Sequence, residues 1–480
     1  MTQHSVYEPG TADPLDTAAI FEPFKIGGLT IKNRLIRSSI SGRIDNYDGS
    51  GTRARVNFEE RFAQGGVGAI ITSHVPISPR ARVLPNYAMI DRDERIEFWR
   101  TVSDRVRAHD CHLILQLSHS GRQQDIGGIE NLGRHPDGAT DKVDYFHGLR
   151  ARKMSTQEIG GVVKLFAQGA ARAAAAGVSG LELHSGNGYL FTQFTSRAIN
   201  NRRDEYGGSL ENRTRFLLEV IAAIQTEVGR DFPLIVKVTG KDVNLMPFPR
   251  GNTIHDAVQI AKWCEQAGVH AIHVSTGNMF PHPLNPAGPL PGPEAKLVYQ
   301  SMIASGKWTW RNYLLFRYAL GRRLIDWFWQ RPQQFNVDGR PDPAQVEGLA
   351  ADDAAAIKRA VRIPVLVTGG FQTSHGIGAV LRSGAADAVT IARPLLANPN
   401  LPRDLHNGLA GPAAPLCSCC NRCLVNVIEH PLGCYDESRF EGRGGREAML
   451  REVFAIFDDY VEERPVTLRA TPASSTQRAS

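Results

Sequence analysis

Eight short apolar segments, separated in most places by helical patterns, constrain the fold of this 480-residue chain more than any other feature. Runs such as LIVKVT and AIHVS are too short for buried helices and are rich in β-branched residues, as buried parallel strands are. Helical periodicity fills the intervals, for example at residues 158–175 and 211–227. This alternation predicts an α/β fold, a closed (β/α)8 TIM barrel, with a lead-in hairpin around IGGLTIKNR. The predicted strands are residues 35–40, 67–73, 113–117, 181–183, 234–239, 271–275, 365–368 and 388–391.

The fourth predicted strand ends in polar residues with a definite chemistry. His184, Asn187 and Tyr189 follow this strand, where Ser185 and Gly186 break the pattern. The histidine and the asparagine can both donate hydrogen bonds to one oxygen, and the tyrosine can bring a phenolic proton to a neighbouring carbon. We therefore predict that these three residues are catalytic in the reduction of a C=C bond next to a carbonyl group.

The same stretch resembles the signature of the old yellow enzyme family of FMN-dependent ene-reductases. HSGNGYLFTQF, followed by NRRDEYGGSLENRTRF, matches the family's His-x-x-Asn pair, which binds the substrate oxygen, and the proton-donating tyrosine after it. The resemblance implies an FMN-binding barrel that takes electrons from NADH or NADPH and reduces a small enone or enoyl compound. Hydride would pass from flavin N5 to the substrate, and Tyr189 would supply the proton.

Other strand ends carry groups that suit a flavin. An amide such as Gln116 can pair with the pyrimidine edge of the ring through both its donor and its acceptor, and Lys237 can stabilise negative charge near N1 and O2 of reduced flavin. The run TGGFQTSHGIG places glycine amides before a helix, where they can cradle a phosphate together with Arg393. In the resemblance, Ser41 falls beside flavin O4, whereas Lys237 and Ala392 depart from the family's usual Arg and Gly. The predicted cofactor-binding residues are Ser39, Ile40, Ser41, His74, Gln116, Lys237, Gly369, Gly370, Ala392 and Arg393.

The connection between the sixth and seventh strands, residues 277–362, is far longer than such connections usually are. A Pro-rich loop leads into KWTWRNYLLFRYALGRRLIDWFWQRP, where apolar residues recur at helical spacing and basic residues outnumber acidic ones. We expect a helical lid whose apolar stripe packs on the barrel rim and shapes the substrate pocket, with His282 as a further contact. Peripheral binding to a membrane or a protein through residues 308–329 is the alternative. The stripe consists of Trp310, Tyr313, Leu314, Leu320, Leu324, Trp327 and Phe328.

Five of the seven cysteines lie between residues 417 and 434, which indicates a metal or cluster site in a reducing compartment more than disulfides. Cys417, Cys420, Cys423 and Cys434 have a spacing at which thiolates can converge on a [4Fe-4S] cluster or a zinc ion. The motif is similar to the cluster motif of the trimethylamine dehydrogenase and 2,4-dienoyl-CoA reductase branch of the family. Because no G-x-G-x-x-G unit follows that could supply electrons, we expect a residual structural motif or zinc in preference to a cluster.

Composition and charge are those of an ordinary globular protein. Hydrophobic residues make up 42% of the chain and charged residues 22%, and a net charge of +6 is too mild to favour nucleic-acid binding. The N-terminus lacks the basic and apolar regions of a secretory signal, so we expect a cytoplasmic protein. The expected divisions are a flexible tail (1–18), the barrel (19–402) with its insertion (279–350), a Cys-rich extension (403–464) and a disordered tail (465–480).

The sequence thus predicts an FMN-dependent NAD(P)H oxidoreductase that acts on an activated alkene. Two alternatives stay open. An iron-sulfur flavoprotein that dehydrogenates or demethylates amines would need a cluster at the cysteines. A barrel without catalytic activity could instead bind a membrane or a partner through the insertion.

Overall fold

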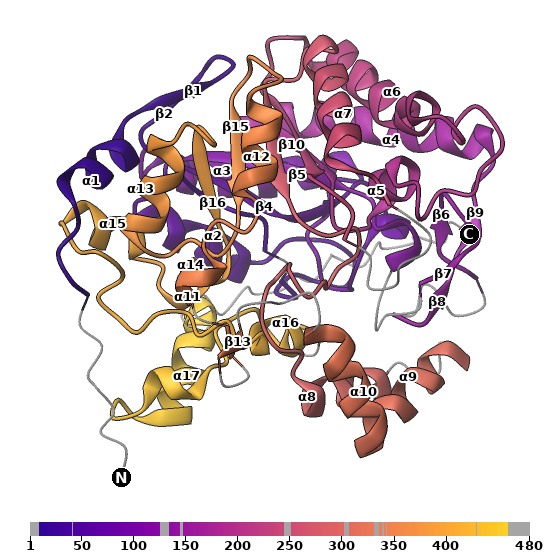
Figure 1. The fold of residues 1–480 in the computed structure, drawn as a ribbon. Coiled ribbons are helices and arrows are strands. Elements are labelled where there is room, and N and C mark those ends of the chain that lie inside the picture. Colours follow the sequence, from indigo (N-terminus) through magenta and orange to yellow (C-terminus); the bar gives the residue numbers. More distant parts are fainter. Residues whose placement is uncertain are drawn as a thin grey trace, which may run out of the picture.

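A computed structural model of the chain describes residues 9–40, 42–124, 134–144, 147–243, 251–301, 307–330, 336–337, 340–341, 343–428 and 430–458. Its centre is a closed barrel of eight parallel strands, which confirms the predicted fold class (Figure 1). The strands run around the barrel in chain order, and the last pairs with the first. They are β3 (Leu35–Arg37), β4 (Ala69–Pro76), β5 (His112–Ser118), β10 (Gly180–Ser185), β11 (Leu234–Thr239), β12 (Ala271–Ser275), β15 (Val365–Thr368) and β16 (Ala388–Ile391).

The last four strands coincide with the predicted segments, whereas the first four differ at their ends. β3 stops at Arg37, and residues 38–40 line the barrel mouth. β4 runs on to Pro76, beyond a register shift between Ile71 and His74 in its pairing with β5. A bulge of this kind changes the direction of the side chains that follow it, and His74 lines the mouth.

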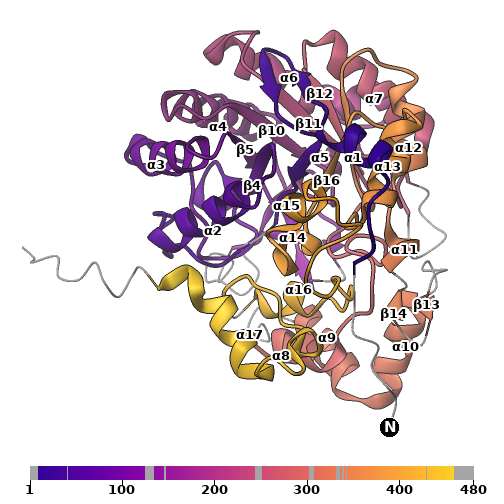
Figure 2. The same cartoon turned by 90° about the vertical axis from the view of Figure 1, so that its left-hand side faces the viewer.

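Helices cover the outside of the barrel (Figures 1 and 2). The helices predicted at residues 158–175 and 211–227 are confirmed as α4 (Thr156–Ala175) and α6 (Leu210–Val228). Ser155 and Glu158 form a reciprocal capping box that fixes the start of α4. The outer helices are α2 (Arg53–Gln64), α3 (Ile96–Arg107), α4 (Thr156–Ala175), α6 (Leu210–Val228), α7 (Ile254–Gln266), α12 (Ala351–Lys358) and α13 (Ser374–Arg382), with short helices α5 (Leu190–Thr195), α14 (Arg393–Ala397) and α15 (Leu401–His406).

The barrel interior is built in layers that set the depth of the site. The predicted hairpin forms as β1 (Phe24–Ile26) and β2 (Leu29–Ile31), and its apolar side chains join a layer of small and branched residues at the bottom of the barrel. Above this layer the inward-facing side chains become polar. These buried polar residues are Gln116, Glu182, Lys237, His273 and Thr390.

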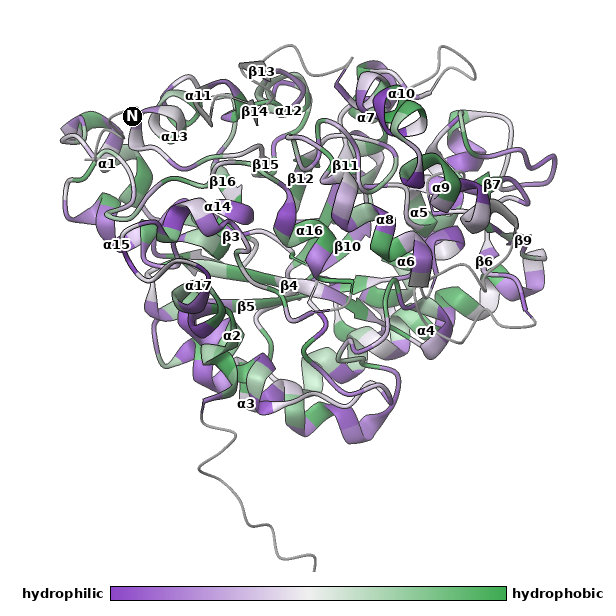
Figure 3. Cartoon of the chain, turned by 90° about the horizontal axis from the view of Figure 1, so that it is seen from below, coloured by the Kyte–Doolittle hydropathy of each residue, from purple (hydrophilic) through white to green (hydrophobic). Residues whose placement is uncertain are grey.

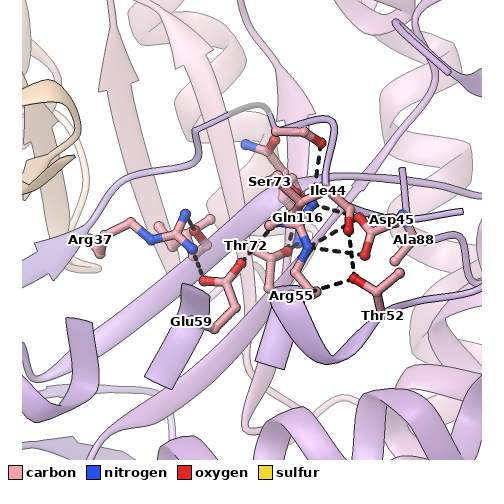
Figure 4. Close-up of polar contacts among 12 residues, drawn as sticks. Arg37, Ile44, Asp45, Thr52, Arg55, Glu59, Thr72, Ser73, Ala88 and Gln116 are labelled. Carbon is pink, nitrogen blue, oxygen red and sulfur yellow. Dashed lines mark hydrogen bonds and ion pairs between the residues drawn. The ribbon is translucent and has the colours of Figure 1, made fainter. Parts of the chain in front are cut away.

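A chain of buried ion pairs holds the segment that follows β3 (Figure 4). Glu59 on α2 pairs with Arg37 and also with Arg55, whose Nη2 lies 2.7 Å from Oδ2 of Asp45. Asp45 also accepts a hydrogen bond of 2.9 Å from the backbone N–H of Ala88. Moving one partner away from a buried ion pair would leave an uncompensated charge. These ion pairs therefore fix the position of the loop that carries residues 38–40.

The insertion and the Cys-rich extension lie on one side of the barrel (Figures 1 and 2). Seen from that side, α16 lies near the centre of the molecule (Figure 3). The insertion contains α8 (Gly292–Ser301), α9 (Lys307–Arg317), α10 (Ala319–Gln330), β13 (Asn336–Val337), β14 (Arg340–Pro341) and α11 (Pro343–Val346), and the extension contains α16 (Arg422–Asn426) and α17 (Gly445–Phe454).

The predicted N-terminal tail is shorter in the structure than the sequence suggested. Residues 14–18, predicted as part of a tail, belong to α1 (Pro14–Phe21), which packs on α13. The predicted tail at 465–480 lies outside the described residues. None of the described helices combines the length and the apolar character that a bilayer span requires.

The connection from β5 to α4 adds the short strands β6 (Asp137–Gly138), β7 (Val143–Asp144), β8 (Leu149–Arg150) and β9 (Arg152–Lys153).

Candidate functional site

A cavity of about 210 Å³ lies at the mouth of the barrel, where the carboxyl ends of the strands meet. Nearly all the residues that were predicted from the sequence to be catalytic or to bind the cofactor line this cavity. Ser41, also predicted, lies outside the described residues. The predicted residues on the cavity wall are Ser39, Ile40, His74, Gln116, His184, Asn187, Tyr189, Lys237, Gly369, Gly370, Ala392 and Arg393.

Asn187 is held so that its amide can act as a donor. Its backbone is in the left-handed region (φ 59°), which asparagine tolerates better than most residues. Its Oδ1 accepts hydrogen bonds from Nδ2 of Asn285 (3.1 Å) and Oγ of Ser275 (3.4 Å). Because the amide oxygen is occupied in this way, the NH₂ group is the side available to a ligand oxygen. Asn285 comes from the insertion, and no pattern in the sequence points to this role.

His184 provides the second donor. Burial lowers its pKa well below the ordinary value, and the positive charge of Lys237 lowers it further. The imidazole is therefore neutral, with one N–H to donate. Its buried Nδ1 has no hydrogen-bond partner within the part of the chain that the structure describes. A ligand oxygen at this position would satisfy it.

Tyr189 packs against two of the histidines that line the cavity. Its ring centre lies 4.7 Å from that of His184 and 5.4 Å from that of His74, edge to face in each case. Burial raises the pKa of Tyr189 well above its ordinary value, so the phenol keeps its proton at neutral pH. The side chain is thus in the protonation state that a general acid needs.

Gln116 has a fixed orientation at the floor of the cavity. Its Nε2 donates to Oε1 of Glu182 at 2.7 Å and to Oγ of Ser39 at 3.0 Å. A carboxylate can only accept hydrogen bonds, so Glu182 determines which end of the amide faces it. The amide nitrogen is therefore engaged within the protein, and the carbonyl oxygen of Gln116 is the group left for a ring N–H. The sequence had suggested that both ends of this amide would pair with the flavin.

Glu182 continues this network across the barrel. Its Oε2 lies 2.6 Å from Nδ1 of His273, and Nε2 of His273 lies 2.9 Å from Oγ1 of Thr390. Burial alone would raise the pKa of Glu182, but His273, Lys237 and the hydrogen bond from Gln116 lower it overall. In the sequence, Glu182 alternates with Leu181 and Leu183 and resembles the polar side of a half-buried strand, so the pattern does not reveal this role. The sequence feature that could have indicated this role is a polar residue within each of two apolar strands, Glu182 on β10 and His273 on β12.

The floor of the cavity also carries a buried cation. Lys237 is almost fully buried, and its Nζ lies 3.4 Å from Oγ of Ser39. Burial lowers the pKa of Lys237, whereas Glu182 acts in the opposite direction. Nearby, Nε2 of His74 contacts the carbonyl oxygen of Ala81 at 3.0 Å, and its buried Nδ1 has no partner among the described residues. A cation, an amide and a vacant imidazole nitrogen suit the polar edge of a flavin ring.

Fewer groups are available to bind a phosphate than the sequence suggested. Gly370 needs its lack of a side chain, because its φ is 72° and a Cβ would lie 2.5 Å from Cγ1 of Val346. Further along the loop, the backbone amides of Gln372 and Thr373 both donate to the carboxylate of Glu347 instead. Nη1 of Arg393 donates to the carbonyl oxygen of Ala287 at 2.7 Å, which ties the arginine to the insertion. Gly369, Gly370, Ala392 and Arg393 are thus the groups left for a phosphate.

The insertion and the extension supply the remaining walls, which are largely apolar. Ala295, Val298 and Tyr299 of α8 line the cavity, as do Leu424 and Val425 of α16. This agrees with the expectation that the insertion shapes the pocket. The sequence could not show that the extension would share this task.

Two expectations for the insertion differ from the structure. His282 does not line the cavity: it is buried, its Nε2 contacts the carbonyl oxygen of Val243 at 2.8 Å, and its Nδ1 accepts the N–H of Leu284 at 3.1 Å. The stripe is divided, because the insertion helices form a core of their own around Tyr299, Tyr313 and Phe316. The members of the stripe that stay exposed are Trp310, Leu320, Leu324 and Trp327.

The four motif cysteines, Cys417, Cys420, Cys423 and Cys434, line a second, much smaller cavity. Cys423 lines both cavities, so the two are adjacent. Burial raises the pKa of Cys434 to about 11. Across the described residues, no three His, Cys, Asp or Glu side chains are grouped closely enough to hold a metal ion.

Comparisons with known proteins agree with this geometry. The model of the NADH:flavin oxidoreductase / NADH oxidase family matches residues 19–301, more than half of the chain. A second model, for dihydrouridine synthase, matches residues 333–479.

Individual relatives cover most of the chain. An NADH oxidase of Thermoanaerobacter brockii is 28% identical over 87% of this chain and 57% of its own length. A cinnamate reductase of Clostridium sporogenes is 27% identical over 84% of this chain and 55% of its own length. The solved complex of 2-naphthoyl-CoA reductase with 2-naphthoyl-CoA has a TM-score of 0.69 and 22% identity, covering 87% of this chain and 56% of that one.

The chain thus spans a little over half the length of each of these proteins. The structural likeness, at this low identity, supports the barrel fold. The family match rests on more than half of the sequence, including β10 and the residues that follow it. The chain belongs to the NADH:flavin oxidoreductase / NADH oxidase family.

Proposed function

We propose that the protein is an FMN-dependent NAD(P)H oxidoreductase that reduces the activated C=C bond of an α,β-unsaturated carbonyl or enoyl compound. One observation carries the proposal. His184, Asn187 and Tyr189 line one cavity with Gln116 and Lys237. Two neutral donors and a protonated phenol are the groups that alkene reduction requires beside a flavin.

The floor of the cavity fits the cofactor. Gln116 would accept a hydrogen bond from the pyrimidine edge of the ring, and Lys237 would lie near the oxygen that gains negative charge on reduction. Gly369, Gly370 and Arg393 would bind the phosphate. When bound there and reduced by NADH or NADPH, the flavin would supply a hydride to the β carbon of the substrate.

The three catalytic side chains have separate tasks. His184 and Asn187 donate hydrogen bonds to the substrate carbonyl oxygen and stabilise the negative charge that develops on it. Tyr189 gives its proton to the α carbon. The apolar walls from α8 and α16 exclude water from this exchange and favour the burial of an apolar substrate tail.

The names of two similar proteins support a conjugated acyl substrate. One relative is named cinnamate reductase, and one structural neighbour holds 2-naphthoyl-CoA. Cinnamate carries a C=C bond conjugated with a carboxyl group, and 2-naphthoyl-CoA carries an aromatic ring conjugated with a thioester.

Anaerobic half-reactions test the proposal. The FMN-loaded protein, reduced with NADH or NADPH, is mixed with cyclohexenone, cinnamaldehyde or cinnamate, and the flavin absorbance and products are followed. We expect reoxidation coupled to a saturated product. If none of these alkenes reoxidises the reduced flavin, and trimethylamine or dimethylglycine reduces the oxidised flavin instead, the result would favour an amine dehydrogenase.

The four motif cysteines, Cys417, Cys420, Cys423 and Cys434, line one small cavity beside the main one. We propose a structural motif or a zinc site there, and a [4Fe-4S] cluster is the alternative. Analysis of zinc, iron and acid-labile sulfide in anaerobically purified protein separates the two. We expect no iron or sulfide. Iron and sulfide in equal amounts, lost in the Cys423→Ala variant, would show a cluster and leave the flavin proposal untouched.

A further inference from the structure

Exposed apolar side chains are concentrated on the insertion. Of the nine large apolar side chains that are exposed within the described residues, six lie on or between α8, α9 and α10. In a monomeric protein, exposed apolar residues usually occur singly, and a contiguous patch marks an interaction surface. We call this set the insertion patch: Leu297, Trp310, Tyr318, Leu320, Leu324 and Trp327.

The patch is not the unpacked side of a poorly folded element. Leu320, Leu324 and Trp327 follow one another at helical spacing and are 82%, 50% and 56% exposed. On the same helix, Trp329 is 3% exposed, and its Nε1 donates to the carbonyl oxygen of Gly288 at 2.8 Å. α10 therefore already has a buried side, and its apolar outer side is additional.

The helices that carry most of the patch have an excess of positive charge. Residues 307–330 contain five basic side chains and one acidic side chain, Asp326. Arg317 and Arg323 are exposed beside Leu320 and Leu324. In Figure 3, apolar green turns alternate with polar purple turns along α9 and α10. Tryptophan and leucine flanked by arginine are the composition of helices that lie in the interface of an anionic membrane.

We propose that the insertion patch binds the surface of an anionic lipid bilayer. α10 has 12 residues, which is too short to span a bilayer, so it would lie along the surface with its apolar side turned into the lipid. A second copy of the chain is a poorer occupant, because the two patches would bring like charges together. The proposal does not depend on the reaction that the cavity performs.

The insertion patch and the cavity belong to the same packed set of helices. α8 packs on α9, and α9 packs on α10. Residues of α8 such as Val298 and Tyr299 line the cavity. The element that would contact the bilayer therefore also forms a wall of the cavity.

Co-sedimentation of the full-length, FMN-loaded protein with vesicles tests the proposal. Vesicles of phosphatidylcholine alone are compared with vesicles that also contain phosphatidylglycerol. We expect binding to the anionic vesicles only, weakened by added salt, and a blue shift of tryptophan fluorescence. The triple variant Leu320→Ser, Leu324→Ser, Trp327→Ser should lose at least about tenfold in partitioning. Arg317→Gln with Arg323→Gln should lose binding mainly at low salt.

Two controls keep the result interpretable. Leu15 is 63% exposed on α1, outside the insertion, and Leu15→Ser should bind vesicles like the wild type. Retained flavin and an unchanged unfolding midpoint in the triple variant would exclude misfolding, since the substituted side chains are exposed. Undiminished vesicle binding by the triple variant would overturn the proposal. The proposal would also be overturned if the wild-type protein were a dimer that does not bind vesicles and the triple variant were a monomer.

Discussion

Oε2 of Glu182 lies 2.6 Å from Nδ1 of His273 inside the barrel, and neither side chain is exposed. Since the pKa of Glu182 is lowered, the carboxylate is ionised and the proton of this contact belongs to the imidazole. The other carboxylate oxygen accepts the amide N–H of Gln116. A buried pair that itself lines no part of the cavity thus determines which group Gln116 presents to the proposed flavin site.

Glu182→Gln should weaken FMN binding. The substitution replaces a charged acceptor with an amide, so the orientation of Gln116 is no longer enforced. Hydrogen bonds to charged groups contribute about 1.5–3 kcal/mol, so we expect a loss of about tenfold or more in affinity. Fluorescence titration of the apoprotein with FMN measures it. Glu219→Gln, which removes a carboxylate bound to the hydroxyl of Tyr206 on the outside of the barrel, is the matched control. Equal affinities in the two variants would refute the role of Glu182.

Tyr189→Phe should separate the two half-reactions. The variant keeps the ring that packs on His184 but loses the only proton that the side chain can donate. We expect flavin reduction by NAD(P)H at the wild-type rate and alkene reduction slower by about a hundredfold. Stopped-flow absorbance of each half-reaction checks this. If alkene reduction keeps its rate, another group donates the proton.

Replacing His184 and Asn187 together should weaken the binding of phenols, which place an oxygen where the substrate carbonyl would lie. Loss of two hydrogen bonds predicts a decrease of at least about tenfold in affinity. The long-wavelength band that phenols give with oxidised flavin serves as the readout. Because the pKa of His184 is well below its ordinary value, the wild-type affinity should follow the ionisation of the phenol and show no histidine titration near pH 6.5. A histidine titration in that range would contradict the neutral imidazole.

Buried neutral histidines should make the fold sensitive to acid. Burial lowers the pKa of His119 and His282 to about 4 and that of His74 to about 3. Below pH 6.5 the unfolded chain takes up protons at these positions and the folded chain does not. The free energy of unfolding should therefore decrease as the pH falls from 6.5 towards 4, by up to roughly 1.4 kcal/mol per pH unit for each histidine.

Urea unfolding at a series of pH values measures this decrease. His282 lies outside the cavity, so His282→Gln is the informative variant. It should reduce the slope of stability against pH below 6.5. A slope equal to that of the wild type would mean that His282 does not titrate on unfolding.

The barrel and the polar mouth could be predicted because each depends on local pattern. Four strands, β11, β12, β15 and β16, were predicted at their observed bounds, since fully buried parallel strands are continuous apolar runs. The candidate site residues could be nominated because barrel topology brings the ends of distant strands to one place. Their chemical roles are proposals that the experiments above test.

Other features depend on partners that are distant in the sequence. Glu182 looks like a solvent-facing residue until β12 brings His273 opposite it. Asn285 orients Asn187 across nearly a hundred residues. The amphipathic stripe indicated helices, but periodicity cannot tell which apolar residues meet a core and which stay exposed. Tyr313 is buried and Leu320 is 82% exposed, although both belong to the same predicted stripe.

The flavin content of the native protein tests the central claim most directly. We predict that the purified protein is yellow and that denaturation releases one FMN per chain. Excess NADH or NADPH should bleach the colour in the absence of oxygen, and Lys237→Met with Arg393→Met should abolish flavin retention. A folded protein that binds no FMN, or that retains it undiminished without both cations, would contradict the account.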